Sequence, residues 1–458
     1  MSQLLTSLLR KPSARDYLEG AVEAAQWLRS IEVGTDHGSY WAQHPTRGEG
    51  FGQIDFTHGT AGILMLFLQL AEASGDASYL EDAKCGGDFI VHELDAHGID
   101  YLCSNMRRGH YLEGVHDSLK SGGAAGVAYI LTELNRYVPD ENYTRVALSL
   151  TDTIVNDAVP APGGVMWSGK SGVNFDSGTI LYLLWAAKRY GRPEWAELAA
   201  SAGRAILTTG VKAETGGTRF TGFRNMVRLM EGFESDEYDV PNFVYGSSGI
   251  GFTFARLYEE TGDEAFLAGA KEAAAYIAGI AQVEGDAALL PYRLPDLPDV
   301  HYLSTCHGNV GTARLFYILA DLTGDARYRE WLEKIANGIL ATGAPELHSP
   351  GYWNCYSVCC GTAGFAHLFA ALYLRSGDER YLSAARRCGF VLLRQASREG
   401  GGLCWHQAFK RIDPDDISVE AGYDHGAAGI AVSLLHVYLA EQGKAPVLRA
   451  PDESFLRR

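Results

Sequence analysis

Cys359-Cys360-Gly361-Thr362-Ala363-Gly364 is one copy of a short phrase, Gly-x-x-Gly followed by an apolar run, that the chain repeats seven times. The other copies are His58-Gly59-Thr60-Ala61-Gly62, Gly123-Ala124-Ala125-Gly126, a degraded Asp176-Ser177-Gly178, Tyr245-Gly246-Ser247-Ser248-Gly249, Cys306-His307-Gly308-Asn309-Val310-Gly311 and His425-Gly426-Ala427-Ala428-Gly429. Their first glycines, at positions 59, 123, 178, 246, 308, 361 and 426, number units one to seven and lie 53 to 68 residues apart. Such self-similarity is typical of one supersecondary unit copied around a structure.

A second turn, Ser-Gly-Asp or Thr-Gly-Asp, follows in four units, with its glycine 16 residues after the first one, at positions 75, 262, 324 and 377. The segment after Gly246 is apolar on nearly every side, whereas residues 264–280 carry their apolar side chains on one face. A helix that is apolar all round is buried, and an amphipathic helix covers it. We therefore predict an all-α fold, an α/α toroid with seven inner and seven outer helices.

The Gly-x-x-Gly turns are expected to gather at one end of the inner ring. Glycine suits that place because it lets backbones approach closely and adopts positive φ without strain. The whole chain, residues 1–458, is expected to form one domain, with a helical lead-in over residues 1–50 and seven repeats from about residue 55 to 445. Toroids exceed the usual limit of roughly 250–300 residues for one core because each unit packs against its neighbours.

The composition limits which partners and which cellular location we expect. The net charge of −17 argues against nucleic acid, which requires a concentrated basic face. We find no signal peptide and no apolar run near the roughly 20 residues of a membrane span. We therefore expect a cytoplasmic protein that binds neither nucleic acid nor membrane.

Three of the eight cysteines, Cys306, Cys359 and Cys360, occupy corresponding positions before a glycine in two consecutive units. A toroid would bring them together, and three thiolates suit zinc while leaving a fourth position open. Cys355 is a rival ligand because it lies four residues before Cys359. The remaining cysteines are interpreted as small buried apolar side chains, and they are Cys85, Cys103, Cys388 and Cys404.

The repeats and the cysteine pattern together resemble the lanthionine synthetase C-like cyclases. The resemblance covers nearly the whole chain, from the copy at His58 to the copy at His425 and the final Ala450-Pro451-Asp452 segment. In that family the fifth and sixth units hold one zinc ion, and one branch carries Cys-Cys-Gly in the sixth unit. Cys306, Cys359 and Cys360 match the ligands of that branch.

The resemblance implies a Michael-type addition, in which a peptide cysteine attacks dehydroalanine or dehydrobutyrine and closes a thioether ring. A bound cation removes the proton from a thiol whose ordinary pKa is about 8.5. Three thiolates and Zn²⁺ carry a formal charge of −1, which we expect to make a fourth, substrate thiolate more reactive. The implied partner is a dehydrated precursor peptide, and a separate dehydratase must supply it.

The addition also requires a proton for the enolate carbon and polarisation of the adjacent carbonyl. His307 follows a proposed ligand and is the first candidate for the general acid, with His58 and His425 as alternatives. Where relatives commonly place a histidine this chain has Tyr245, which becomes a further candidate. Where they place an aspartate it has Leu119, with His116 and Asp117 close enough in sequence to replace it.

Two other functions compete with the cyclase. A toroid glycosidase would need two facing carboxylates, for which the inner positions offer Asp176 and Asp424. A relative could instead add glutathione or another small thiol to dehydroamino acids, or bind peptides without catalysis. The preponderance of Cys, His and Tyr at these positions favours zinc.

Overall fold

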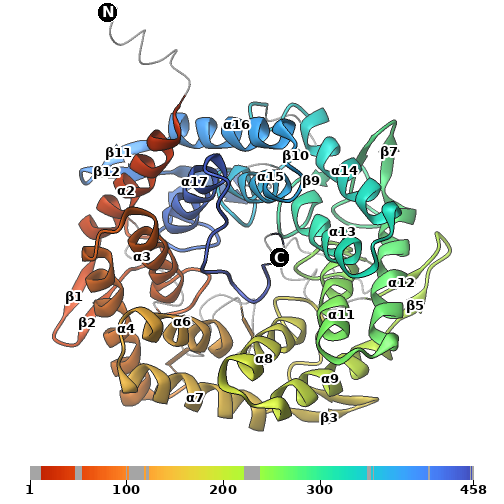
Figure 1. The fold of residues 1–458 in the computed structure, drawn as a ribbon, viewed down its shortest axis with the longest axis horizontal. Helices are drawn as coiled ribbons and strands as arrows, with labels where there is room; N and C mark the ends of the chain where they lie inside the picture. The colour runs from red at the N-terminus through yellow and green to blue at the C-terminus, as the bar shows by residue number, and fades with distance from the viewer. Residues whose placement is uncertain are drawn as a thin grey trace, which may run out of the picture.

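The computed structural model describes residues 12–46, 54–99, 101–102, 118–119, 123–220, 238–347, 352–353, 355–410, 413–453 and 455. Within these ranges the helices form two concentric rings, as Figure 1 shows. The inner ring comprises α3 (Thr60–Ser74), α6 (Ala124–Tyr137), α8 (Asp176–Tyr190), α11 (Ser247–Thr261), α13 (Asn309–Thr323), α15 (Thr362–Ser376) and α17 (Ala427–Glu441). The outer ring comprises α2 (Ala14–Ser30), α4 (Ser78–His97), α7 (Glu141–Asn156), α9 (Pro193–Leu207), α12 (Glu264–Ile280), α14 (Ala326–Ala341) and α16 (Glu379–Gln395). The predicted α/α toroid of seven inner and seven outer helices is confirmed.

Burial follows the predicted pattern. In the inner helix α11, ten of the eleven residues from Ser247 to Leu257 are buried, and Arg256 is the exception. In the outer helix α12 the buried positions recur on one face and include Phe266, Ala270, Ala273 and Ile277. The inner ring is therefore enclosed by its neighbours and by the outer ring, and the outer helices present their polar faces to solvent.

The Gly-Asp turn ends one helix and begins the next. Gly262 adopts φ 68° and its amide donates to Tyr258 O, while the Asp263 carboxylate accepts from the amide of Ala265 and caps α12. Gly324-Asp325 and Gly377-Asp378 repeat the arrangement. A left-handed glycine costs little where other residues are strained, and an aspartate cap satisfies a free amide of the new helix.

The glycines of the Gly-x-x-Gly turn have a different role, because they allow close backbone contact. A Cβ atom on Gly361 would lie 1.8 Å from Cys355 O, and one on Gly249 would lie 1.8 Å from Phe243 O. The φ angle of the first glycine is negative, for example −158° at Gly361. Close approach therefore explains this turn, and positive φ explains the turn at the opposite end of the helix.

The register predicted for the third unit is wrong. Helix α8 begins after Phe175 and ends at the left-handed Gly191. Phe175 therefore takes the place of the first glycine, and Gly178 corresponds to the second one. A Cβ on Gly178 would lie 2.2 Å from Val173 O, as expected for that second position.

The ring closes between elements that are distant in sequence. Helix α2, predicted as a lead-in, is an outer helix that packs against the inner helix α17, and α17 also packs against α3. Figure 1 shows this closure, with the red helix α2 beside the blue helices α16 and α17. Among the described residues no helix follows α17. The N-terminal helix α2 therefore occupies the outer position of the seventh unit.

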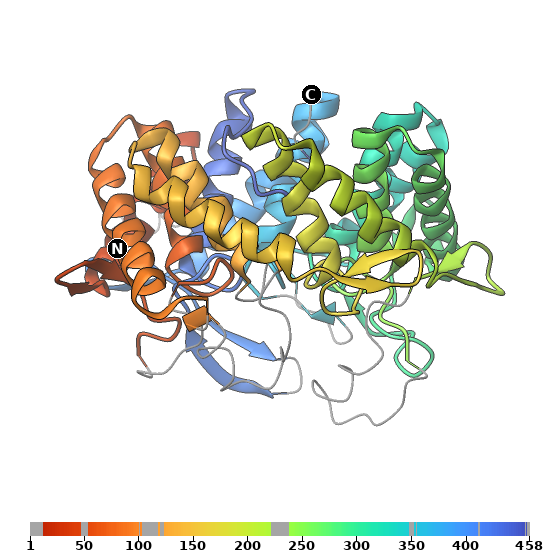
Figure 2. The same cartoon turned by 90° about the horizontal axis from the view of Figure 1, so that it is seen from below.

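Short two-stranded sheets lie on one side of the rings, and the sequence prediction missed them. Most are antiparallel hairpins, whose strands are β1 (Val33–Thr35) with β2 (Gly38–Tyr40), β3 (Val159–Ala161) with β4 (Gly164–Met166), β5 (Val211–Lys212) with β6 (Thr218–Arg219), β7 (Gln282–Glu284) with β8 (Ala287–Leu289), β11 (Ser397–Glu399) with β12 (Gly402–Cys404), and β13 (His406–Lys410) with β14 (Asp413–Val419). The pair β9 (His301–Tyr302) and β10 (Tyr352–Trp353) is parallel. Figure 2 shows the long β13–β14 hairpin, in blue, projecting below the helices.

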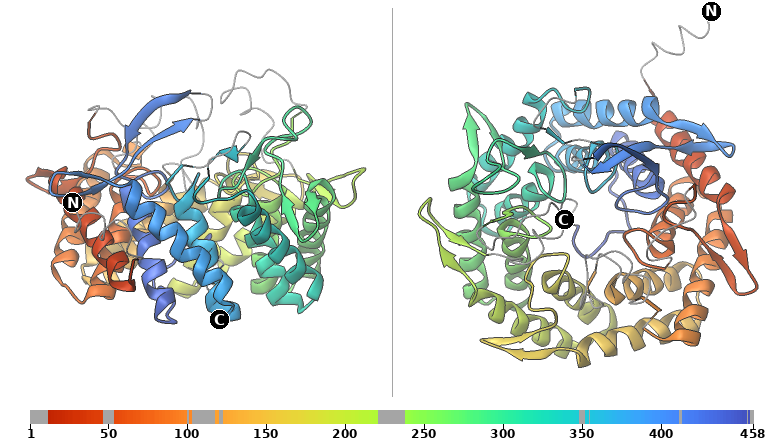
Figure 3. Two further views of the ribbon diagram at one scale, coloured as in Figure 1. Left: turned by 90° about the horizontal axis from the view of Figure 1, so that it is seen from above. Right: turned by 180° about the vertical axis from the view of Figure 1, so that it is seen from behind.

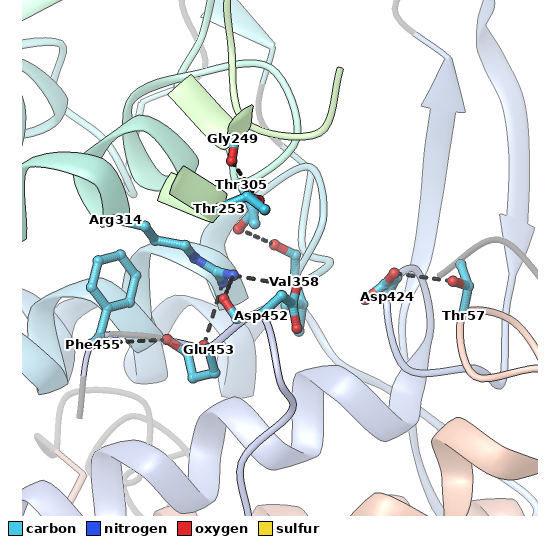
Figure 4. Close-up of polar contacts among 10 residues, drawn as sticks. All are labelled: Thr57, Gly249, Thr253, Thr305, Arg314, Val358, Asp424, Asp452, Glu453 and Phe455. Carbon is cyan, nitrogen blue, oxygen red and sulfur yellow. Dashed lines mark hydrogen bonds and ion pairs between the residues drawn. The ribbon is translucent and has the colours of Figure 1, made fainter. Parts of the chain in front are cut away.

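Residues 442–453 turn into the middle of the ring (Figure 1). Tyr129 of α6 donates its hydroxyl to Arg449 O at 2.8 Å, and the buried Arg314 of α13 donates to Asp452 O at 2.9 Å. Figure 4 shows Arg314 also facing Glu453 and Phe455. This segment therefore connects inner helices on opposite sides of the ring. None of the described helices is both long and apolar enough to cross a bilayer.

We expect Gly249→Ala to lower the free energy of unfolding by about 1–3 kcal/mol or more, because the new methyl group overlaps Phe243 O. The matched control is Gly34→Ala, since no atom lies within 4 Å of the Cβ position there. The control should stay within about 0.5 kcal/mol of the parent. Urea denaturation measures both, and equal midpoints for the two variants would contradict the role given to the close contact.

Candidate metal centre

The segments that precede the inner helices of units five and six carry the cysteines. Cys306 and Cys359 each lie two residues before the first glycine of their unit, and Cys360 lies directly before Gly361. The amides of Thr305 and Cys306 both donate to Cys359 O, at 3.0 and 3.1 Å. Adjacent units are therefore joined by main-chain hydrogen bonds at the cysteines themselves.

These bonds belong to a series that continues around the ring. The amide of Val244 donates to Cys306 O at 3.1 Å, the amide of Cys359 to Asp424 O at 2.8 Å, and the amide of Asp424 to Thr57 O at 3.0 Å. Figure 4 shows Asp424 beside Thr57, whose hydroxyl lies 3.2 Å from the Asp424 carboxylate. Units four, five, six, seven and one thus hold each other's turns in fixed positions.

The sulfur atoms of Cys306, Cys359 and Cys360 lie within 4.8 Å of one another. Cys306 Sγ and Cys360 Sγ are 3.6 Å apart. Tetrahedral zinc with bonds of about 2.3 Å to sulfur requires a sulfur separation of roughly 3.8 Å. The donor set and its spacing therefore fit a zinc ion bound by three cysteines.

Two serine side chains contact the cysteine trio. Ser304 Oγ lies 3.4 Å from Cys306 Sγ, and Ser357 Oγ accepts from the Cys360 amide at 3.1 Å. Both serines are fully buried. Outer groups of this kind orient ligands and tune their affinity for a metal.

Charge is distributed unevenly over the three thiols. Burial opposes ionisation of Cys306, but hydrogen bonds from Cys359 and Cys360 and the nearby His307 outweigh it and hold the pKa of Cys306 well below its usual range. Hydrogen bonding with Cys306 raises the pKa of Cys359 and of Cys360. Without a cation, the cluster therefore favours one thiolate stabilised by two protonated neighbours.

Cys355 belongs to the same buried sulfur cluster. Its Sγ lies 3.2 Å from Ser357 Oγ, and its carbonyl oxygen accepts from the Thr362 amide. Cys355 is not one of the three residues whose sulfur atoms all lie within 4.8 Å of one another. Cys355 thus borders the trio and shares the support of Ser357.

His307 is buried against tyrosine rings beside the metal centre. Its ring centroid lies 5.1 Å from Tyr245, 5.1 Å from Tyr292 and 5.7 Å from Tyr302. Asn174 donates to the Tyr245 hydroxyl at 3.3 Å. Burial, followed by the charges of Cys306 and Cys359, raises the pKa of Tyr245 well above its usual range, so Tyr245 keeps its proton.

Tyr292 and Tyr302 were missed by the sequence prediction. Tyr302 lies six residues before Gly308, in the position that Cys355 occupies relative to Gly361, and Tyr292 lies in the segment after β8. Both are buried. The spacing of Tyr302 from Gly308 was the available signal, whereas Tyr292 lies outside the repeated phrase.

His58 and His425 meet where the ring closes, as the prediction of adjacent units required. Their ring centroids are 4.9 Å apart. Each Nδ1 atom faces a buried carboxylate, with His58 3.5 Å from Asp55 Oδ1 and His425 3.7 Å from Glu420 Oε2. Burial opposes protonation of His58, but Asp55, Glu420 and Asp424 together raise its pKa.

Other predicted residues lie apart from the cysteine trio or outside the described ranges. His116, Asp117 and Cys103 fall outside the described residues. Asp176 is buried at the start of α8, where its carboxylate accepts from Ser168 and Trp167, and burial raises its pKa. The Asp176 carboxylate is thus held by residues of its own unit, whereas the Asp424 carboxylate accepts from the Thr57 hydroxyl of unit one.

Residues 177–373 match the family model described as lanthionine synthetase C-like protein. No curated protein sequence matches the chain. Among solved structures, nisin cyclase is 16% identical with a TM-score of 0.58, and the alignment covers 92% of this chain and 93% of that one.

A weaker likeness is to the unsaturated glucuronyl hydrolase of Bacillus sp. GL1, with 16% identity, a TM-score of 0.46 and coverage of 72% of this chain and 84% of that one. The α-1,6-mannanase GH76A of Salegentibacter sp. HEL1_6 has 15% identity and a TM-score of 0.42 over 71% of this chain and 86% of that one. Both scores are too low to bear on function. Residues 177–373 thus match the lanthionine synthetase C-like family, and the double ring of helices has the fold of nisin cyclase.

Proposed function

We propose that the protein is a zinc-dependent cyclase that adds peptide cysteine thiols to dehydroalanine or dehydrobutyrine and so forms thioether rings. The observation that carries the proposal is the cluster of Cys306, Cys359 and Cys360 in a chain whose residues 177–373 match the model of this family. Its substrate would be a dehydrated precursor peptide delivered by a separate dehydratase. The cytoplasmic location stays a prediction.

Cys306, Cys359 and Cys360 would hold one zinc ion, which when bound supplies a positive charge that favours the thiolate form of a substrate cysteine. Three protein ligands leave one position for that thiol. The main-chain bonds between units five, six and seven keep the three sulfur atoms in place before any substrate arrives. Such preorganisation reduces the cost of assembling the site around the peptide.

His307 would deliver the proton that the enolate carbon needs. Its imidazole follows the ligand Cys306 in sequence and lies against Tyr245, Tyr292 and Tyr302, which exclude water from it. Tyr245, which keeps its hydroxyl proton, would donate a hydrogen bond to the carbonyl next to the double bond. These two groups approach the site from units five and four.

His58 and His425 would form a second source of protons. Asp55 and Glu420 face their Nδ1 atoms, and a carboxylate in that position favours the protonated imidazole. The Asp424 main chain links this pair to Cys359. Asp117 lies outside the described residues, and its role stays a prediction.

A synthetic peptide with one dehydroalanine and one cysteine separates the competing reactions. Ring closure removes the free thiol without changing the peptide mass, whereas addition of glutathione increases the mass by one glutathione. A peptide that is bound and left unchanged indicates a binding module. The thiol count and the mass together therefore identify the reaction.

We expect Cys306→Ala, Cys359→Ala and Cys360→Ala each to remove about one zinc per chain, because two thiolates hold zinc much more weakly than three. The helical rings should persist, since their core excludes these side chains. Plasma mass spectrometry measures the metal, and circular dichroism measures helix content. Cys85→Ala, on the outer helix α4, is the control, and full zinc retention by all three variants would contradict the assignment.

We expect Ser357→Ala to weaken zinc binding about tenfold or more while preserving the fold, because the Cys360 amide and Cys355 thiol lose their shared partner. Competition with a coloured chelator gives the affinity. Ser376→Ala is the control, since the Ser376 hydroxyl bonds Leu372 O and the Asp378 amide at the far end of α15. An unchanged affinity for Ser357→Ala would show that the serine does not orient the cysteines.

We expect His307→Asn to keep its zinc but to slow cyclisation about 10²-fold or more, the usual contribution of general acid catalysis. The rate is measured as loss of free thiol from the synthetic peptide. His97→Gln, an exposed histidine on α4, should leave the rate unchanged. Equal rates for parent and His307→Asn would move the proton delivery to His58 or His425.

A further inference from the structure

We propose that the chain holds a second cation site outside the cysteine trio, formed by Glu399, Cys404 and His406 and suited to zinc. One ligand atom from each residue lies within 4.8 Å of the other two. His406 Nε2 and Glu399 Oε1 are 2.6 Å apart. The site combines a carboxylate, a thiol and an imidazole, each of which is a zinc ligand.

The β11–β12 hairpin places these groups together. Glu399 ends β11, and Gly400 and Gly401 form the turn with φ angles of 56° and 81°. Two central residues with positive φ give a tight hairpin turn, which fixes the strand register. Ser397 consequently pairs with Cys404, and Glu399 pairs with Gly402.

Cys404 and His406 lie two positions apart in extended chain, so their side chains point to the same side. Trp405, between them, points to the opposite side, where its indole donates to Leu392 O of α16 at 2.8 Å. Trp405 is buried and Cys404 has no exposed surface. The hairpin is thus anchored to the outer ring, and the thiol forms the base of the site.

The charges of the three groups suit a divalent ion. A carboxylate and a thiolate together neutralise a charge of +2, and a neutral imidazole completes three ligands. Magnesium and calcium prefer oxygen donors, so the sulfur and nitrogen favour zinc. In the absence of a cation, burial and then Glu399 raise the pKa of Cys404 to about 12, so the thiol keeps its proton.

The site differs from the centre between units five and six. It offers one sulfur atom in place of three, and the side chains of Glu399 and His406 are 43% and 42% exposed. Metal bound there would exchange with solvent more readily. Zinc content should therefore exceed one per chain when free zinc is plentiful and fall toward one during dialysis.

A cation here would fix the base of the β13–β14 hairpin. His406 begins β13, and its neighbour Gln407 accepts from the Tyr356 amide at 2.9 Å and donates to His425 O at 2.6 Å. Tyr356 follows Cys355, and His425 precedes Gly426. Figure 3 (right) shows the blue hairpin crossing the ends of α15 and α17. The role inferred for this cation is structural. It would join the β11–β12 hairpin to β13, the strand whose Gln407 bonds residues next to the cysteine cluster.

Cobalt titration under reducing conditions tests the site independently of cyclase activity. In the Cys306→Ala/Cys359→Ala/Cys360→Ala variant we expect one cobalt per chain, with sulfur-to-cobalt absorption about one third of that of a centre with three thiolates. Adding Cys404→Ser should abolish the absorption. Adding Glu399→Gln or His406→Gln should weaken cobalt binding at least tenfold, and both residues are exposed enough for the fold to survive.

The control is His97→Gln in the same background, since His97 and Glu93 form an exposed histidine–glutamate pair without a nearby thiol in the described structure. It should leave cobalt binding unchanged. If the triple variant does not fold, the parent protein replaces it in the experiment. The parent is first loaded with one zinc per chain, and cobalt is then titrated into the second site. Failure to bind cobalt through sulfur, or binding that is indifferent to Glu399→Gln and His406→Gln, overturns the second site and leaves the proposed cyclase untouched.

Discussion

The contact between a glycine Cα and a main-chain carbonyl just upstream governs the rest of the structure. At Gly308 an added Cβ would lie 1.3 Å from Tyr302 O, and at Gly429 it would lie 1.7 Å from Tyr423 O. Any other residue would push the turn away from its helix, because a buried main chain cannot shift without breaking hydrogen bonds. The series of main-chain bonds that joins neighbouring turns depends on this proximity, and so does the spacing of the cysteine sulfur atoms.

The repeat and its helices could be predicted because their signals are local and recur. The glycine spacing reflects close approach of two backbone segments, and the Gly-Asp turn reflects a left-handed backbone. The segments that are apolar all round reflect complete burial of a helix. The register of unit three was misjudged because Phe175 replaces the first glycine, which leaves only Gly178 to align. The hairpins were missed because strands of two or three residues are too short for alternation to be recognised.

The residues of the candidate site likewise include some that the sequence predicted and some that it did not. Cys306, Cys359 and Cys360 were found because the repeat gave them corresponding positions, and the meeting of His58 and His425 followed from closing a ring. Tyr292 was missed because it contacts the site through tertiary packing from outside the repeated phrase. Asp55 and Glu420 were missed although they lie only three and five residues before the histidines that they face. Cys404 was interpreted as an inert buried thiol, and the proximity of Glu399 and His406 depends on a turn that periodicity does not reveal.

The pairing of α2 with α17 has a consequence for how the chain is made. Their residues are separated by roughly four hundred positions, so α2 leaves the ribosome long before its partner is synthesised. Until then its apolar side chains, including Trp27 and Leu28, lack the surface that buries them. The final step of folding is therefore expected to be a long-range closure, slow and dependent on chain entropy, during which a nascent chain would be a natural client for chaperones.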